Sequence, residues 1–114
     1  MKKINIIKKN YIFSKIIKEC NPVKTKQYIV YVDNKVDGLY QFGISVSKKI
    51  GNAVMRNKIK RQIKNIIDKK DYKNNFNCII IVRKDFLLNS FSENENVLLN
   101  TFKKFELFKE DNYE

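Results

Sequence analysis

The 114-residue chain contains no histidine, one proline, three glycines and two cysteines. The lack of histidine removes the commonest general base and the commonest metal ligand. No HExxH, Walker, GxSxG or clustered Cys/His motif is present either, so the side chains are poor candidates for carrying out a reaction alone. Cys20 and Cys78 form no CxxC pair, and we expect both to stay reduced, with Cys78 as a small core residue.

Long apolar runs are also missing. No stretch of about 18 apolar residues is available to span a membrane, and no apolar region follows the basic N-terminus as it would in a signal peptide. We therefore expect a cytoplasmic protein with no membrane partner. The length predicts a single domain, residues 1–114.

Acidic residues are the scarcer charge, because 24 Lys and Arg stand against 12 Asp and Glu and leave a net charge of +12. Such an excess favours a polyanionic partner, and nucleic acid and an anionic membrane surface are the two common ones. The plain alternative is a basic surface without any ligand.

Apolar periodicity predicts six main elements in the order α-β-β-α-β-α. They are a helix at Tyr11–Cys20 with Asn10 as N-cap, strands at Gln27–Asp33 and Leu39–Ser47, a helix at Ala53–Lys70, a strand at Asn77–Arg83 and a helix from Ser92 to about Phe108. The NKVDG segment between the first two strands indicates a hairpin-type loop. One more short strand fits before Gln27 or at Leu39. Ser92 and Glu95 match a capping box, and residues 106–114 form an acidic tail that we expect to fray.

The predicted strand at Leu39–Ser47 has one apolar face and one face of small residues. The apolar face consists of Phe42, Ile44 and Val46, and the small face of Gly43, Ser45 and Ser47. Successive side chains of a strand point to opposite sides, so the small face leaves room for something to lie close against the sheet.

The segment Lys48–Lys64, which we call the basic segment, reads KKIGNAVMRNKIKRQIK and contains no acidic residue. With Ile59 facing the core, helical geometry places its polar residues on the outer side. Arg56, Lys60 and Lys64 then form an unrelieved row of positive charge, although like charges at this spacing destabilise a helix. A partner outside the chain would explain that row. A solvated face without a ligand and a helix lying on an anionic membrane are the alternatives.

The run from Phe42 to Arg61, FGISVSKKIGNAVMRNKIKR, resembles the signature of the protein subunit of bacterial ribonuclease P. The Lys-rich N-terminus, the strand QYIVYV and an apolar strand ending in Arg83-Lys84 agree with that family in layout. Three positions depart from it. Lys58 and Lys64 stand where the family has Arg, and Ile17 stands where it commonly has an aromatic residue.

The resemblance implies an α+β fold, a two-layer α/β sandwich with a sheet of about four strands. This fold is similar to the second domain of ribosomal protein S5 and has a left-handed βαβ crossover containing the basic helix. The usual handedness of such connections would have predicted the opposite.

The resemblance also implies a function. The protein would be the non-catalytic subunit of a ribonucleoprotein endoribonuclease that removes the 5′ leader of precursor tRNA. Its partners would be the ribonuclease P RNA and precursor tRNA, with no small-molecule substrate. The RNA would carry the chemistry with Mg²⁺ held mainly by RNA. Oligomeric state and any direct metal contact by the protein stay open.

Two RNA-binding surfaces follow from the resemblance. The contact with the catalytic RNA would comprise nine residues of the basic segment: Lys48, Lys49, Asn52, Arg56, Asn57, Lys58, Lys60, Arg61 and Lys64. A shallow cleft between the first helix and the sheet would hold the leader, lined by Phe13, Ile17, Tyr31, Ser45 and Ser47, with Arg56 and Asn57 at its rim. Aromatic faces stack on unpaired bases. For Phe13 and Ile17, plain core packing is the alternative.

Two other functions remain to be weighed. One is a non-catalytic RNA-binding module, such as a ribosome-associated protein of the same general fold. The other is a self-sufficient nuclease, which needs clustered carboxylates. The aspartates are instead scattered over predicted loops and helix ends, at Asp33, Asp37, Asp68, Asp71 and Asp85.

Overall fold

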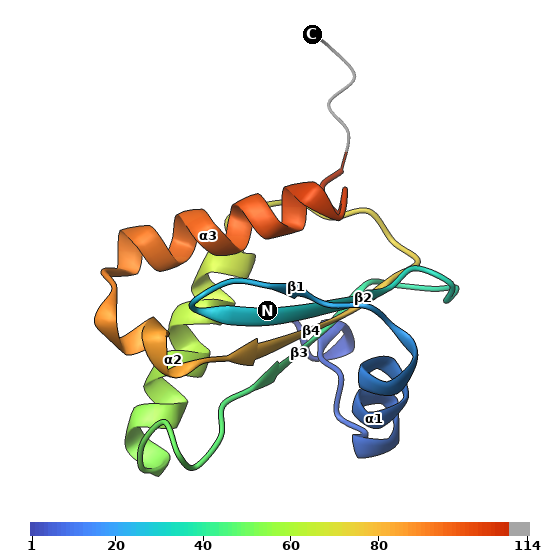
Figure 1. Cartoon of the computed structure of the whole chain (residues 1–114). Coiled ribbons are helices and arrows are strands. Elements are labelled where there is room, and N and C mark those ends of the chain that lie inside the picture. Colours follow the sequence, from blue (N-terminus) through green and yellow to red (C-terminus); the bar gives the residue numbers. More distant parts are fainter. Residues whose placement is uncertain (110–114) are drawn as a thin grey trace, which may run out of the picture.

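The computed structural model describes residues 1–109 and contains one four-stranded sheet with three α-helices (Figure 1). The elements in chain order are the short 3₁₀ helix η1 (Lys3–Asn5), α1 (Asn10–Glu19), β1 (Val23–Lys24), β2 (Tyr28–Asp33), β3 (Gln41–Ser45), α2 (Ala53–Ile67), β4 (Asn77–Val82), the 3₁₀ helix η2 (Lys84–Leu88) and α3 (Phe91–Lys104). The short extra strand expected before Gln27 is β1. The α+β class and the four-stranded sheet are confirmed.

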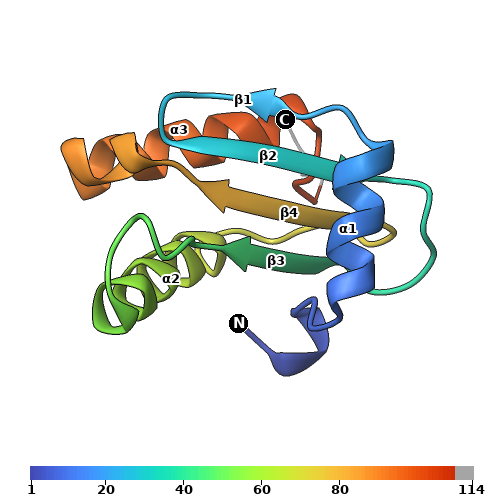
Figure 2. The same cartoon turned by 60° about the horizontal axis from the view of Figure 1, so that its bottom comes forward.

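The strands lie in the order β1-β2-β4-β3, with β4 between β2 and β3. β4 pairs antiparallel with β2 and parallel with β3. The hairpin expected between β2 and β3 is therefore wrong, since these strands are not neighbours. Cys78, Ile79 and Ile80 are fully buried because β4 is central and covered on both faces. The connection from β3 through α2 to β4 is left-handed, as the family resemblance implied (Figure 2).

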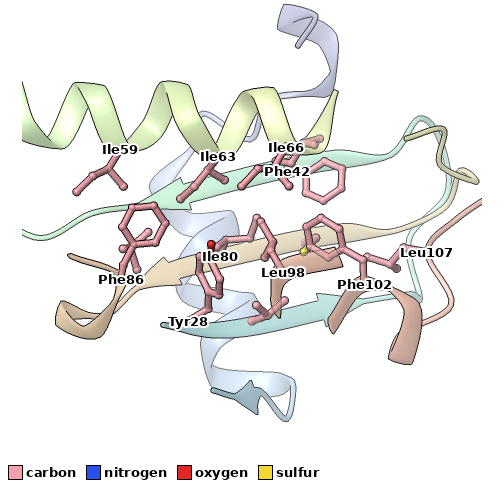
Figure 3. Close-up of a cluster of buried hydrophobic side chains, with 14 of the residues drawn as sticks. Tyr28, Phe42, Ile59, Ile63, Ile66, Ile80, Phe86, Leu98, Phe102 and Leu107 are labelled. Atoms are coloured by element: carbon pink, nitrogen blue, oxygen red, sulfur yellow. The ribbon is translucent and has the colours of Figure 1, made fainter. Parts of the chain in front are cut away.

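The main core lies between the sheet and the layer formed by α2 and α3 (Figure 3). From α2, Ile59, Ile63 and Ile66 project onto the sheet, because these residues fall on one side of the helix. Phe42 from β3 and Phe102 from α3 meet them with ring centroids 5.4 Å apart. This packing fixes α2 against the sheet, and so decides which of its residues face outward.

A second, smaller cluster covers the opposite face of the sheet, where α1 lies (Figure 2). It consists of Ile7, Ile16 of α1 and Ile79 of β4, all buried, with half-buried neighbours around them. α1 covers only part of this face, so some of the sheet stays open to solvent beside it.

Helix boundaries differ from the predicted ones at several points, and the predicted end of the last helix near Phe108 is wrong, since α3 ends at Lys104. Asn10 is the first residue of α1 and not its N-cap, since Lys9 holds the cap position without a side-chain hydrogen bond. α2 ends at Ile67, three residues before the predicted end. The capping box of α3 uses Ser90 and Glu93 instead of Ser92 and Glu95.

The end of the chain is more ordered than expected up to Lys109. α3 ends at Lys104, and Leu107 is then buried beneath the helix layer. Phe108 forms an antiparallel bridge with Tyr72. The expectation of fraying is thus wrong for residues 106–109, and residues 110–114 of the predicted tail lie outside the described part of the chain.

Candidate nucleic-acid interface

The basic segment forms a turn at residues 48–50 followed by the greater part of α2. The nine residues predicted to contact RNA are accessible: Lys48, Lys49, Asn52, Asn57, Lys58 and Arg61 are exposed, and Arg56, Lys60 and Lys64 are half-buried. Ile59 and Ile63 are at most 2% exposed, so the predicted division of α2 into a core side and an outer side is confirmed.

None of the cations of the basic segment has an acidic partner within residues 1–109. The two ion pairs found there join the N-terminal amine to Asp68 and Lys69 to Glu95. The Nε atom of Arg56 is buried and has no hydrogen-bond partner in the described chain. A buried donor without an acceptor costs free energy. A ligand that accepted a hydrogen bond from Arg56 would remove this cost when it bound.

Asn52 has a local role at the start of α2. Its side-chain Oδ1 accepts a hydrogen bond from the backbone N–H of Met55 at 2.9 Å, which satisfies one of the free donors at the helix terminus. Ser47 acts similarly in the preceding turn, where its hydroxyl accepts from the N–H of Lys49 at 3.2 Å. Both residues thus shape the entry into α2, and their exposed side chains keep part of their hydrogen-bonding capacity.

On the other face of the sheet, Phe13 of α1 lies directly against β3 at Gly43. A Cβ atom at residue 43 would come within 2.5 Å of the Phe13 Cζ atom, so only glycine permits this approach. Phe13 is half-buried and borders the smaller cluster, whereas Ile17 is 40% exposed and Ile16 takes the buried position. Phe13 therefore packs on the sheet and is also partly accessible to solvent. Ile17 is not a core residue.

Strand register places the remaining predicted cleft residues on this same face. Tyr31 is opposite Ile79, which is opposite Gly43. Two positions along the strands, toward the start of α2, the same face carries one residue from each of the four strands. These paired residues are Lys24, Ile29, Ile81 and Ser45. We call this row the open strip, since none of its members is buried. Ser47 is exposed beyond the end of β3 and connects the strip to the basic segment.

A basic hollow at one end of the open strip was not predicted from the sequence. It has a volume of about 660 Å³ and four cationic residues among those that line it: Lys24, Lys26, Arg83 and Lys84. Arg83 is anchored there by donating from Nη1 to the carbonyl of Thr25 at 2.9 Å. These cations come from segments nearly 60 positions apart in the sequence, and only the pairing of β1, β2 and β4 brings them together.

The aspartates of the alternative nuclease hypothesis do not form a site. No group of three His, Cys, Asp or Glu residues close enough to hold a metal occurs within residues 1–109. Asp68 pairs with the N-terminal amine, while Asp85 borders the basic hollow. In the same part of the chain, no helix has the length and apolarity needed to cross a membrane.

Comparison with known proteins agrees with the sequence resemblance. A family model described as Ribonuclease P matches residues 1–106. The ribonuclease P protein component of Mesoplasma florum is 39% identical over 101 residues, which are 86% of this chain and 92% of that protein. The corresponding protein of Bacillus velezensis is 39% identical over 111 residues, with 96% of each chain covered.

Solved structures show the same similarity in three dimensions. A mutant of the Staphylococcus aureus RNase P protein superimposes with a TM-score of 0.81 at 36% identity, covering 93% of this chain and 92% of that one. The RNase P protein of Thermotoga maritima gives a TM-score of 0.72 at 28% identity, covering 81% of this chain and 89% of that one.

Proposed function

Since this chain belongs to the ribonuclease P protein family, we propose that its basic segment binds the RNA subunit of ribonuclease P and its open strip binds the 5′ leader of precursor tRNA. In this role the chain assists the endonucleolytic step that produces the mature tRNA 5′ end. The observation that carries the proposal is a continuous cationic surface on α2 whose charges have no acidic partner within the described chain.

Contact with the RNA subunit is supported by the row Arg56, Lys60 and Lys64. Three cations at successive turns of one helix can follow a phosphate backbone, and each contact releases counterions from the RNA. The guanidinium of Arg56 offers bidentate contacts to phosphate, whereas Lys60 and Lys64 act as point charges.

Contact with the leader is supported by the surroundings of the open strip. Phe13 and Tyr31 offer aromatic surface on which unpaired bases can stack, and stacking tolerates any sequence. The small Ser45 side chain lets a single strand approach the sheet. The basic hollow around Arg83 lies where the strand would continue, so its cations would neutralise leader phosphates.

The chemistry of cleavage belongs to the RNA in this proposal. Mg²⁺ held mainly by the RNA supplies the activated water, and the chain contributes no catalytic residue. Its own side chains bind and orient the substrate by holding the leader on one face while the basic segment holds the RNA subunit. This activity places the protein in the cytoplasm.

Reconstitution tests the proposal. The RNA subunit from the same genome, the purified chain and a precursor tRNA are combined at low magnesium concentration, and release of the 5′ leader is followed by gel electrophoresis. We expect no cleavage by protein alone, slow cleavage by RNA alone and much faster cleavage by both together. Cleavage by the protein without RNA, or no effect of the protein on the RNA, would refute the proposal.

A charge variant tests the surface assigned to the RNA subunit. Replacing both Lys60 and Lys64 by Ala should lower the slope of log K against log salt concentration by about 1.4–1.8, because each lost phosphate contact removes about 0.7–0.9. The double variant Lys103→Ala with Lys104→Ala on α3 is the matched control, since it removes the same charge elsewhere. Equal slopes for the two double variants would show that α2 is not the contact.

A further inference from the structure

A hollow of about 230 Å³ lies between α2, η2 and the start of α3, on the edge of α2 that carries Lys58 and Gln62. Its outer walls are apolar but unusually accessible: Met55, Leu87 and Phe91 are 39%, 46% and 40% exposed. The adjoining Val54 and Leu88 are 77% and 81% exposed. Three of the nine large exposed hydrophobic residues of the described chain therefore line this one hollow, and two more are sequence neighbours of its lining.

Asn94, one of the residues that line the hollow, carries an unsatisfied polar atom. Asn94 is 2% exposed, and its Nδ2 donates to the carbonyl of Phe86 at 2.9 Å. That hydrogen bond fixes the orientation of the amide, so the other atom of the group, Oδ1, is an acceptor. It has no donor within hydrogen-bond distance in the described chain. Buried acceptors are normally paired, so this one indicates a donor that the chain itself does not provide.

The charge around the hollow argues against a second copy of this chain as the occupant. Lys58 lines the hollow and Arg61 follows it one turn along α2, within the unpaired basic segment. Lys69 is 5.4 Å from the centroid of the Phe91 ring, but it is already paired with Glu95. Two chains of charge +12 would repel one another here, whereas a polyanion would be attracted.

We propose that this hollow holds one unpaired nucleobase of the RNA that α2 binds. The base would lie against the ring of Phe91 and the side chains of Met55 and Leu87, an edge N–H would donate to Asn94 Oδ1, and Lys58 would contact the adjoining phosphate. Each part of a nucleotide then meets a matching group: an apolar face, a lone acceptor and a cation. The inference rests on the proposed function, because it assumes that the basic segment lies against RNA.

Three single variants test the proposal with the ribonuclease P RNA of the same genome as ligand. Phe91→Ala should weaken binding about fivefold to 150-fold, the range expected when one base loses an aromatic stacking partner. Its salt dependence should equal that of the wild type, since no phosphate contact is lost. Phe91→Leu keeps the apolar volume and should still weaken binding. Leu88→Ala is the control, because residue 88 is more exposed and does not line the hollow.

Chemical probing supplies an independent readout. In the wild-type complex one unpaired base should be protected from modification, and in the Phe91→Leu complex that base should become reactive while the remaining protections persist. Thermal unfolding of each variant by circular dichroism checks that the fold is retained.

Wild-type affinity and unchanged protections in Phe91→Leu would overturn the nucleobase site while leaving the proposed function intact. The same conclusion would follow if Phe91→Leu abolished self-association in sedimentation experiments without changing RNA affinity, since the surface would then be a protein interface. Failure of the wild-type chain to bind or activate the RNA would instead refute the proposed function as well.

Discussion

Gly43 and Phe13 form a contact that joins the stability of the chain to its proposed leader surface. The absence of a side chain at residue 43 lets the Phe13 ring lie on β3, with the missing Cβ position only 2.5 Å from Cζ. The sequence predicted a small-residue face with room for something close to the sheet. The structure shows that the Phe13 ring fills the space beside Gly43. The space beside Ser45 stays open, since this residue is not buried.

Substituting Gly43 by Ala tests this contact. The new methyl group must displace the Phe13 ring, and overpacking of this kind costs about 1–3 kcal/mol of unfolding free energy. Urea denaturation measures the loss, and binding assays should show weaker affinity for precursor tRNA with unchanged affinity for mature tRNA. In a Phe13→Ala background the same substitution should cost almost nothing more, since the clash is gone. An equal loss in both backgrounds would mean that the ring is not what the methyl group meets.

At the scale of single elements, the sequence located each α-helix, and the start of α2 at Ala53, but not most of the other helix ends. Two overlapping Ser-x-x-Glu patterns occur at the start of α3, one beginning at Ser90 and the other at Ser92. Both satisfy the local rule for a capping box. The structure uses the first: Ser90 Oγ accepts from the N–H of Glu93, and the Ser90 carbonyl accepts from the N–H of Asn94. Asn94 is buried there and donates from Nδ2 to the Phe86 carbonyl, a contact with the preceding segment that the local sequence pattern does not contain.

The two serines of this segment should differ sharply in their effect on stability. Ser90→Ala removes the side chain that accepts from the N–H of Glu93 at 3.1 Å, and loss of such a cap costs about 0.5–2 kcal/mol. Ser92→Ala is the matched control, since it changes the same atoms inside the helix and should leave the free energy of unfolding nearly unchanged. Chemical denaturation of both variants measures the difference, and a larger loss for Ser92→Ala would contradict the assigned cap.

At the scale of the whole molecule, the order of the strands in space could not be read from their order along the chain. Local signals gave β2, β3 and β4 correctly, but β4 inserts between the other two. The basic hollow depends on that insertion, because Lys24 and Arg83 meet only through the pairing of β1 with β2 and of β2 with β4. The α2 surface was predictable for the opposite reason, since it lies within one helix and follows from its periodicity.

The buried core makes the stability of the whole chain sensitive to alkaline pH. Burial raises the pKa of the Tyr28 and Tyr72 hydroxyls above their ordinary value of 10, and that of the Cys78 thiol above its ordinary 9. The folded chain therefore keeps protons that the unfolded chain releases. Stability from these groups is complete below about pH 9 and should fall as pH rises, by about 1.4 kcal/mol per pH unit for each group beyond its unfolded pKa.

Urea denaturation between pH 8 and pH 11 measures this slope, and a double variant isolates the tyrosines. Tyr28→Phe with Tyr72→Phe removes two hydroxyls that donate to the carbonyls of Asn94 and Ile67, so it should be less stable than the wild type at pH 8. Its stability should nevertheless decline less steeply with pH, because only the thiol remains to titrate among the three. All other side chains are the same in the two proteins, so they influence both curves alike. Parallel curves for the two proteins would show that the buried hydroxyls do not control alkaline unfolding.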